Sequence, residues 1–300
     1  MAEERPQGPN RRTDGRPQGG SGGGKPRGGK PRSDKPRGDQ ARGGKRPRRK
    51  NDWSRPADKQ VPRTEQQAQY DGPPLPEEIT GKELDRAVAG QLKGLPEKLA
   101  ARVARHLAAA GLLIDEDPET AYQHTLAARG RASRLAVVRE ATGEAAYAAG
   151  HYAEALSELR AAKRMNGATA YLPIMADCHR ALGQPAQALK LARSPGVASF
   201  KADAKAEMTI VEAGARRDLG QVDEAIRTLE HAPLNSKSRE PWVVRLRYAY
   251  ADALEEAGRS NDALTWFHRT QAVDGADLTD AAERAAALER SAEAQPGDAG

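Results

Sequence analysis

The stretch Gly143-Glu-Ala-Ala-Tyr-Ala-Ala-Gly150-His-Tyr-Ala-Glu-Ala155-Leu-Ser-Glu-Leu159 contains the pattern on which the fold prediction depends. On both sides of Gly150, apolar residues recur at spacings of three and four, which is typical of amphipathic helices. Glycine accepts the left-handed backbone conformation with which many helices end. The stretch therefore predicts two helices joined by a short turn at Gly150.

The same pattern occurs three more times along the chain. Gly183, Gly220 and Gly258 follow Gly150 at intervals of 33, 37 and 38 residues. Small residues stand seven positions before and five positions after these glycines: Gly143, Ala176, Ala213, Ala251, Ala155, Ala188, Ala225 and Ala263. A large aliphatic residue follows the second small one each time: Leu156, Leu189, Ile226 and Leu264. Small residues let two helices approach closely, so four copies in one register predict four stacked helical hairpins.

These hairpins resemble the tetratricopeptide repeat, most clearly in residues 143–162 and 258–267, where Ala263 and Phe267 supply its Ala-x3-Phe element. Intervals of 37 and 38 exceed the 34 residues of that family, which predicts longer connections near residues 194–202 and 231–240. As a whole, the chain resembles tetratricopeptide proteins of actinobacteria that have a basic N-terminus. The resemblance implies an all-α solenoid and a cytoplasmic location, and it assigns no activity.

The domain organisation follows from composition and periodicity. No stretch alternates with period two, so we expect an all-α body, with helices near residues 82–92, 95–111, 118–129 and 280–291. Asp117 is a good N-cap and Pro118 suits the first helical position. The predicted segments are an arm with its linker at 1–76, a divergent hairpin region at 77–130, four degenerate repeats at 131–275, a capping helix at 276–292 and a tail at 293–300.

Charge is distributed unevenly between the two parts of the chain. Residues 1–70 hold 19 Lys and Arg against 8 Asp and Glu, whereas the remaining residues hold 29 against 34. A basic segment on a mildly acidic body favours a polyanionic partner for the segment. The basic segment and the body therefore form separate candidate binding surfaces.

The basic arm, residues 1–76, is predicted to be disordered, because Val61 is the only branched aliphatic residue between Arg5 and Arg63. It repeats Lys-Pro-Arg at a period of five, which presents positive charge to a phosphate backbone without reading a base sequence. The candidate nucleic-acid-binding residues are Lys25, Arg27, Lys30, Arg32, Lys35, Arg37, Arg42, Lys45, Arg46, Arg48, Arg49 and Lys50. The arm resembles the RGG-type segments of RNA-binding proteins, which favours RNA. The alternative is a solvated tail with no fixed partner, and Trp53 could stack on a base or dock on the body.

Catalytic, metal and cofactor sites are not expected. The six histidines lie on different predicted helices and turns without a metal-binding spacing, and no phosphate-binding or nucleophile motif occurs in the body. The acidic run 115–119 is interpreted as a helix start rather than a calcium loop.

Cys178 is the only cysteine and no run of about 18 apolar residues occurs, so we expect a cytoplasmic protein without a membrane span. The basic run 45–50 could also be a nuclear import signal.

A protein-binding groove is expected on the concave face, which the first helix of each pair lines in tetratricopeptide arrays. By this resemblance the groove residues are Glu140, Glu144, Tyr147, Asp177, Arg180, Ile210, Arg217, Tyr248, Asp252, Glu255 and Glu256. None is the lysine or asparagine with which some members grip a carboxylate, so a peptide of mixed charge is expected around Arg180 and Arg217. The alternative is that these residues are solvated helix faces. The first functional hypothesis is an adaptor that holds an unidentified protein or peptide, and the second is an RNA-associated protein with a passive body.

Overall fold

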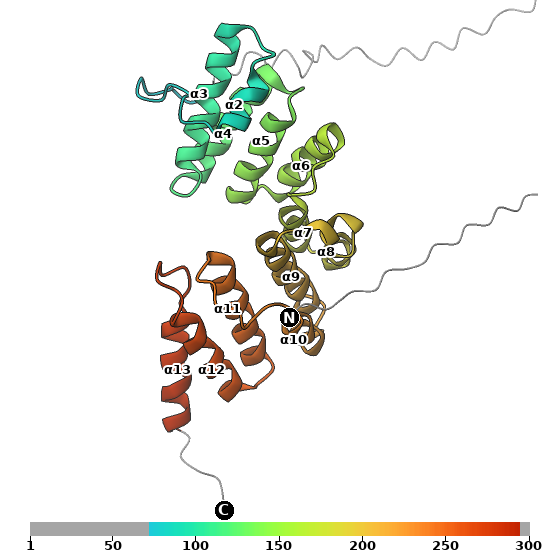
Figure 1. Ribbon diagram of the computed structural model, residues 1–300, viewed down its shortest axis with the longest axis vertical. Coiled ribbons are helices and arrows are strands. Elements are labelled where there is room, and N and C mark those ends of the chain that lie inside the picture. Colours follow the sequence, from blue (N-terminus) through green and yellow to red (C-terminus); the bar gives the residue numbers. More distant parts are fainter. Residues whose placement is uncertain (1–71, 295–300) are drawn as a thin grey trace, which may run out of the picture. The chain divides into compact units, whose positions relative to one another are not determined.

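The structure is a computed structural model that describes residues 72–294. The chain divides into two units, Met1–Pro56 and Ala57–Gly300, and all described residues belong to the second. Between residues 72 and 294 there are twelve α-helices, one short 3-10 helix and no strand, which confirms the all-α prediction (Figure 1). The elements are α2 (Arg86–Leu92), α3 (Glu97–Leu113), α4 (Pro118–Ala132), α5 (Ala136–Ala148), α6 (Tyr152–Asn166), α7 (Leu172–Ala181), α8 (Pro185–Ala192), η1 (Pro195–Ser199), α9 (Ala202–Arg217), α10 (Val222–Glu230), α11 (Pro241–Glu256), α12 (Ser260–Gln271) and α13 (Ala281–Ala294).

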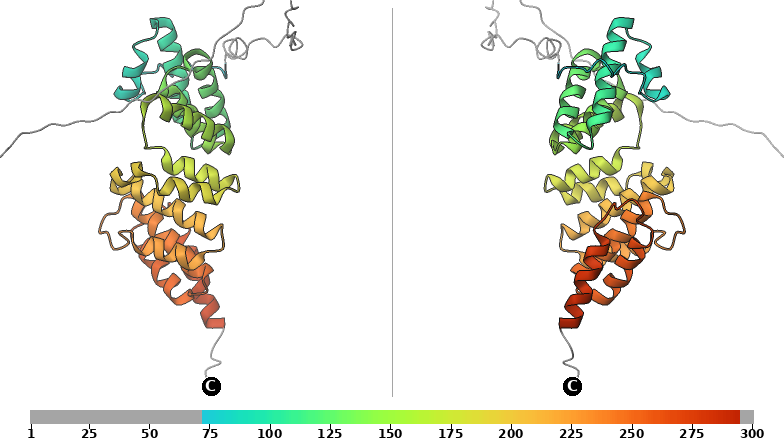
Figure 2. Two further views of the ribbon diagram at one scale, coloured as in Figure 1. Left: turned by 90° about the vertical axis from the view of Figure 1, so that its right-hand side faces the viewer. Right: turned by 90° about the vertical axis from the view of Figure 1, so that its left-hand side faces the viewer.

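The helices pack as hairpins in chain order. The pairs are α3 with α4, α5 with α6, α7 with α8, α9 with α10 and α11 with α12, and α13 packs on α12 (Figure 2). The first helices also contact one another in succession, α5 with α7, α7 with α9 and α9 with α11. Apolar clusters follow this order, from α2–α5 through α3–α9 to α9–α13. The successive first helices therefore form one continuous surface.

The four predicted turns are confirmed. The φ angles at Gly150, Gly183, Gly220 and Gly258 are 76°, 69°, 72° and 74°, in the left-handed region that glycine accepts without strain. The residue after each glycine donates its backbone N–H to the carbonyl five positions earlier, as His151 does to Ala146 at 2.8 Å. This bond ends the first helix of each pair and starts the turn into the second.

The small residues of the repeat mark the points where paired helices come closest. All seven alanines of that set are at most 2% exposed. At Gly143 in α5, a Cβ atom would lie 2.5 Å from Cγ of Leu159 in α6. Because no real Cβ contact is this short, the two helices can approach as they do only with glycine at this position. The register inferred from the sequence is therefore the register of the structure.

The boundaries upstream of the repeats differ from the prediction. Helix α2 begins at Arg86 rather than near 82, because the Asp85 side chain accepts a hydrogen bond from the backbone N–H of Ala87 and caps the helix there. Helix α3 continues to Leu113, two residues past the predicted end. The cap at Asp117 is confirmed, since its carboxylate accepts from the N–H of Thr120 at 3.1 Å.

Two segment boundaries also need correction. Helix α4 runs to Ala132, so the boundary predicted between 130 and 131 falls inside a helix. Helix α13 runs to Ala294, so the capping helix extends into the predicted tail at 293–300. The long connections are found at 193–201 and 231–240, as the repeat spacing predicts, and the former contains η1.

Candidate interaction groove

Three neighbouring hollows lie on the first helices of the hairpins, and together we call them the first-helix groove. The Glu144 hollow, about 240 Å³, lies among α2, α3 and α5. The Asp177 hollow, about 490 Å³, lies among α5, α7 and α9, and the Arg217 hollow, about 280 Å³, lies among α7, α9 and α11. The last two share Arg180 and Ile210. The groove thus follows the surface on which sequence reasoning placed the partner.

Nine of the eleven predicted groove residues line these hollows. They are Glu140, Glu144, Tyr147, Asp177, Arg180, Ile210, Arg217, Tyr248 and Asp252. Glu255 and Glu256 line none of the three, and both form ion pairs from the end of α11. The predicted set is therefore gathered on one surface, with its last two members at the rim.

Arg180 is held by carboxylates of two helices. Its Nη1 lies 2.9 Å from Asp177 in α7, and its Nε lies 2.8 Å from Asp218 at the end of α9. Gly214 leaves room for the guanidinium, because a Cβ atom there would lie 2.3 Å from Cζ of Arg180. Sequence reasoning missed Gly214, although a glycine inside a predicted helix signals a close approach.

Two further arginines repeat this arrangement around α11. Arg217 in α9 pairs with Asp252 at 2.5 Å and also with Glu256. Arg284 in α13 pairs with Asp252 at 3.0 Å and with Glu255 at 2.6 Å. Burial opposes ionisation of Asp252, but hydrogen bonds from the two arginines outweigh it and keep its pKa below the usual value. These arginines tie successive first helices together rather than standing free for a partner.

Tyrosines make equivalent links between helices. The Tyr147 hydroxyl donates to Asp177 at 2.6 Å, joining α5 to α7, and the Tyr248 hydroxyl donates to Asp280 at 2.6 Å, joining α11 to the start of α13. Most charged groove residues therefore have ion-pair or hydrogen-bond partners in the chain, while their side chains stay 26–38% exposed. Their polar groups satisfy one another across helix boundaries.

Glu140 and Glu144 in α5 are the exception. Glu140 accepts a hydrogen bond from Nδ2 of Asn166 at 2.6 Å, and Glu144 has a hydrogen bond with Tyr171, the residue before α7. No Lys or Arg among residues 72–294 pairs with either carboxylate. Burial, with a contribution from the charge of Glu140, raises the pKa of Glu144 to about 7 although the Tyr171 hydrogen bond opposes it. Tyr171 was not among the predicted residues because it lies outside the first-helix pattern.

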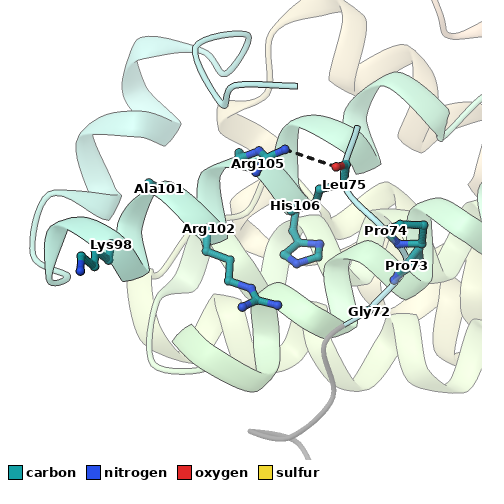
Figure 3. A pocket seen from close by; sticks show the side chains of 9 residues that line it. All are labelled: Gly72, Pro73, Pro74, Leu75, Lys98, Ala101, Arg102, Arg105 and His106. Carbon is teal, nitrogen blue, oxygen red and sulfur yellow. Dashed lines mark hydrogen bonds between the residues drawn. The ribbon is translucent and has the colours of Figure 1, made fainter. Parts of the chain in front are cut away.

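A separate basic hollow of about 540 Å³ lies beside residues 72–75 (Figure 3). Its lining includes Lys98, Arg102, Arg105 and His106, all from α3. Arg105 donates to the backbone carbonyls of Pro76 at 2.7 Å and Ile79 at 2.5 Å. The guanidinium of Arg105 therefore fastens the segment before α2 onto α3.

His106 and His124 come together although they are 18 residues apart in sequence. Their Nδ1 atoms are 3.0 Å apart, and both rings are buried. Burial, with help from His124 and nearby arginines, lowers the pKa of His106 to about 4, so the pair is neutral near pH 7. His106 and His124 lie on different helices, as expected, and their contact is one of core packing.

Between residues 72 and 294, no group of three or more His, Cys, Asp or Glu side chains could hold a metal ion. Cys178 is buried, and burial raises its thiol pKa to about 12. The helices of this region are all too short or too polar to cross a membrane.

The twelve candidate nucleic-acid-binding residues, from Lys25 to Lys50, lie outside the described residues. Comparison of the chain with protein-family models, curated proteins and solved structures found no match.

Proposed function

We propose that this chain is a non-enzymatic scaffold of tetratricopeptide type that binds a segment of a partner protein along the first-helix groove. The observation that carries the proposal is the row of three hollows on α5, α7, α9 and α11, two of which share lining residues. Protein segments bind in such grooves by placing apolar anchors in successive pockets.

The floor of the groove suits apolar anchors. Ile174, Ile210 and Val211 line the Asp177 hollow, and Ala213 and Ala249 line the Arg217 hollow. All five are apolar, and Ile210 belongs to both hollows. A partner side chain placed there would remove apolar surface from water, which contributes about 25 cal/mol per Å².

The charges of the groove favour a basic partner over the mixed-charge peptide expected from sequence. The hollows are lined by five carboxylates, Glu140, Glu144, Asp177, Glu207 and Asp252, and by three arginines, Arg180, Arg217 and Arg245. Asp218, Glu255, Glu256 and Arg284 pair with these residues or with one another at the rim. The arginines are all paired with carboxylates of the chain itself. A partner with Lys or Arg side chains would complement the remaining negative charge.

The test is affinity purification of the full-length protein after nuclease treatment, with two variants as parallel baits. Ile210→Glu places a charge on the floor of two hollows. Met165→Glu makes the same kind of change at the end of α6, where the side chain is 44% exposed and lines none of the three hollows. We expect the partner proteins to be purified with the Met165 variant and to be missing from the Ile210 variant. Partners kept equally by both would place binding elsewhere.

We propose that the basic arm contacts nucleic acid non-specifically in the cytoplasm, and that this nucleic acid is RNA. The supporting observations are its composition, with 19 Lys and Arg against 8 Asp and Glu in residues 1–70, and its repeated Lys-Pro-Arg. If about six to eight cations engage single-stranded RNA, the log–log slope of affinity against salt is about −4 to −6. Fluorescence anisotropy on labelled RNA measures it.

The control for the arm is a full-length variant with the five cations of residues 45–50 replaced by glutamine. This variant should bind RNA more weakly and with a shallower salt slope, because fewer counterions are released. A slope near zero in the parent protein would instead make the arm a solubilising tail. If the full-length protein binds RNA and no protein partner is found for the groove, the second hypothesis is favoured, in which the protein is RNA-associated and the helical body is a passive scaffold.

A further inference from the structure

We propose that the Glu144 hollow anchors one Lys or Arg side chain of the partner, between the apolar walls of the hollow. This inference rests on the proposed groove function. The other two hollows would take apolar side chains of the same segment. The inference names the chemistry of the partner at one end of the groove.

The walls of the Glu144 hollow are mainly apolar. They are formed by Leu84, Ala87, Val88, Leu107, Ala110, Ile114, Val137, Ala141 and Ala145. Glu140 and Glu144 also line it, and they stand four residues apart on α5, so both carboxylates lie on the same face of that helix. Apolar walls beside two carboxylates suit the long aliphatic stem and charged end of Lys or Arg.

The charge of this hollow differs from that of the rest of the groove. Asp177, Asp252 and Glu256 each have an arginine of the chain within ion-pair distance. Glu140 and Glu144 have none among the described residues, and two like charges at this spacing repel each other on a helix. A cation supplied by a partner would relieve that repulsion and pair with both carboxylates, whereas a further cation beside Asp252 would compete with two arginines already in place.

The protonation of Glu144 supports the same conclusion. Its pKa is raised to about 7, so the free protein holds part of this carboxyl group in the neutral form near pH 7. The other titratable groups that line the hollow are Glu140, on the same helix, and Tyr171 before α7. The residues contributed by α2 and α3 are uncharged. A bound cation would lower the pKa of Glu144, so binding should release a proton and strengthen as pH rises.

The experiment uses a displayed library of random 12-residue peptides, selected on the immobilised full-length protein and counter-selected on the variant Ile210→Glu, so that the retained peptides depend on the groove but are not chosen for their response to Glu140 and Glu144. We expect the retained peptides to contain Lys or Arg between apolar residues. Synthetic copies measured by fluorescence anisotropy should bind the variant Glu140→Gln/Glu144→Gln at least about tenfold more weakly, the loss typical of one charged pair worth about 1.4 kcal/mol. The matched control is Glu289→Gln/Glu293→Gln, which removes two exposed carboxylates at the same spacing on α13 and should bind like the parent.

Two further measurements exclude a loss of folding as the explanation. The Glu140 and Glu144 double variant should melt at the same temperature as the parent or higher, because a like-charge pair is removed. In the parent, affinity should rise about tenfold between pH 6 and pH 8, as a carboxyl group of pKa about 7 ionises, and this rise should be absent from the variant.

The outcomes separate this inference from the groove proposal. Peptides that bind the parent, lose affinity with Ile210→Glu and bind Glu140→Gln/Glu144→Gln unchanged would overturn the inference while supporting the groove. Selected peptides without Lys or Arg, or an affinity independent of pH, would also overturn it. If no peptide prefers the parent over Ile210→Glu, both proposals fail.

Discussion

Replacing Gly143 by alanine tests the packing register of the hairpins directly. The new Cβ atom would lie 2.5 Å from Cγ and 2.6 Å from Cδ2 of Leu159. Leu159 is 1% exposed and belongs to the apolar cluster that contains α5 and α6, so relieving the contact requires buried side chains to shift. Overpacking of this kind costs about 1–3 kcal/mol, whereas alanine gains about 1 kcal/mol over glycine in helix propensity. The variant should therefore be less stable than the parent by up to about 2 kcal/mol.

The matched control is Gly111→Ala in α3. Gly111 is exposed inside a helix, and a Cβ atom there would meet nothing within 4 Å, so the change should stabilise by about 0.5–1 kcal/mol. Urea unfolding followed by circular dichroism at 222 nm compares the two variants with the parent. The expected result is opposite signs. If both substitutions stabilise to the same extent, α5 and α6 do not approach at Gly143 and the register is wrong.

Three further predictions concern burial and ion pairs. His106 has a pKa of about 4 in the folded protein and about 6.5 in the unfolded chain, so its contribution to the free energy of unfolding is present above pH 6.5 and is lost as the pH falls toward 4. The free energy of unfolding of the parent should fall by about 3 kcal/mol over this range, and that of His106→Gln should fall by less. Ala225→Glu should lower the unfolding free energy by several kcal/mol, because Ala225 is 0% exposed, and a parent-like melting curve would contradict its burial. Reversing both Arg180 and Arg217 to glutamate should lower stability by at least about 1 kcal/mol for each, since each ties two helices; an unchanged melting temperature would show that these ion pairs do not form.

Much of the fold follows from local signals in the sequence. The turns at Gly150 and its three counterparts could be predicted because one residue type accepts the left-handed backbone. The hairpin register could be predicted because small residues repeat at fixed distances from those turns. The predicted groove surface depends on the same register, which explains why most of its residues line the hollows.

The polar contacts of the groove could not be predicted in the same way. The pairs of Arg180 with Asp218 and of Arg217 with Glu256 span 38 and 39 residues, and their geometry depends on how successive hairpins stack. For the same reason the sequence indicated exposed arginines where the structure has paired ones. Tyr171, His106 and His124 do not belong to the repeat pattern. Sequence periodicity therefore could not predict that Tyr171 contacts Glu144 or that His106 contacts His124.

The most direct test of the central claim is site-specific photo-crosslinking of the full-length protein in its host cell. A benzophenone amino acid placed at Ile210 reports on the floor of the first-helix groove, and the same group at Met165 reports on the exposed end of α6. The proposed function predicts a discrete protein adduct from position 210 and none from position 165. An adduct from position 165 alone, or the same adduct from both, would contradict binding in the groove.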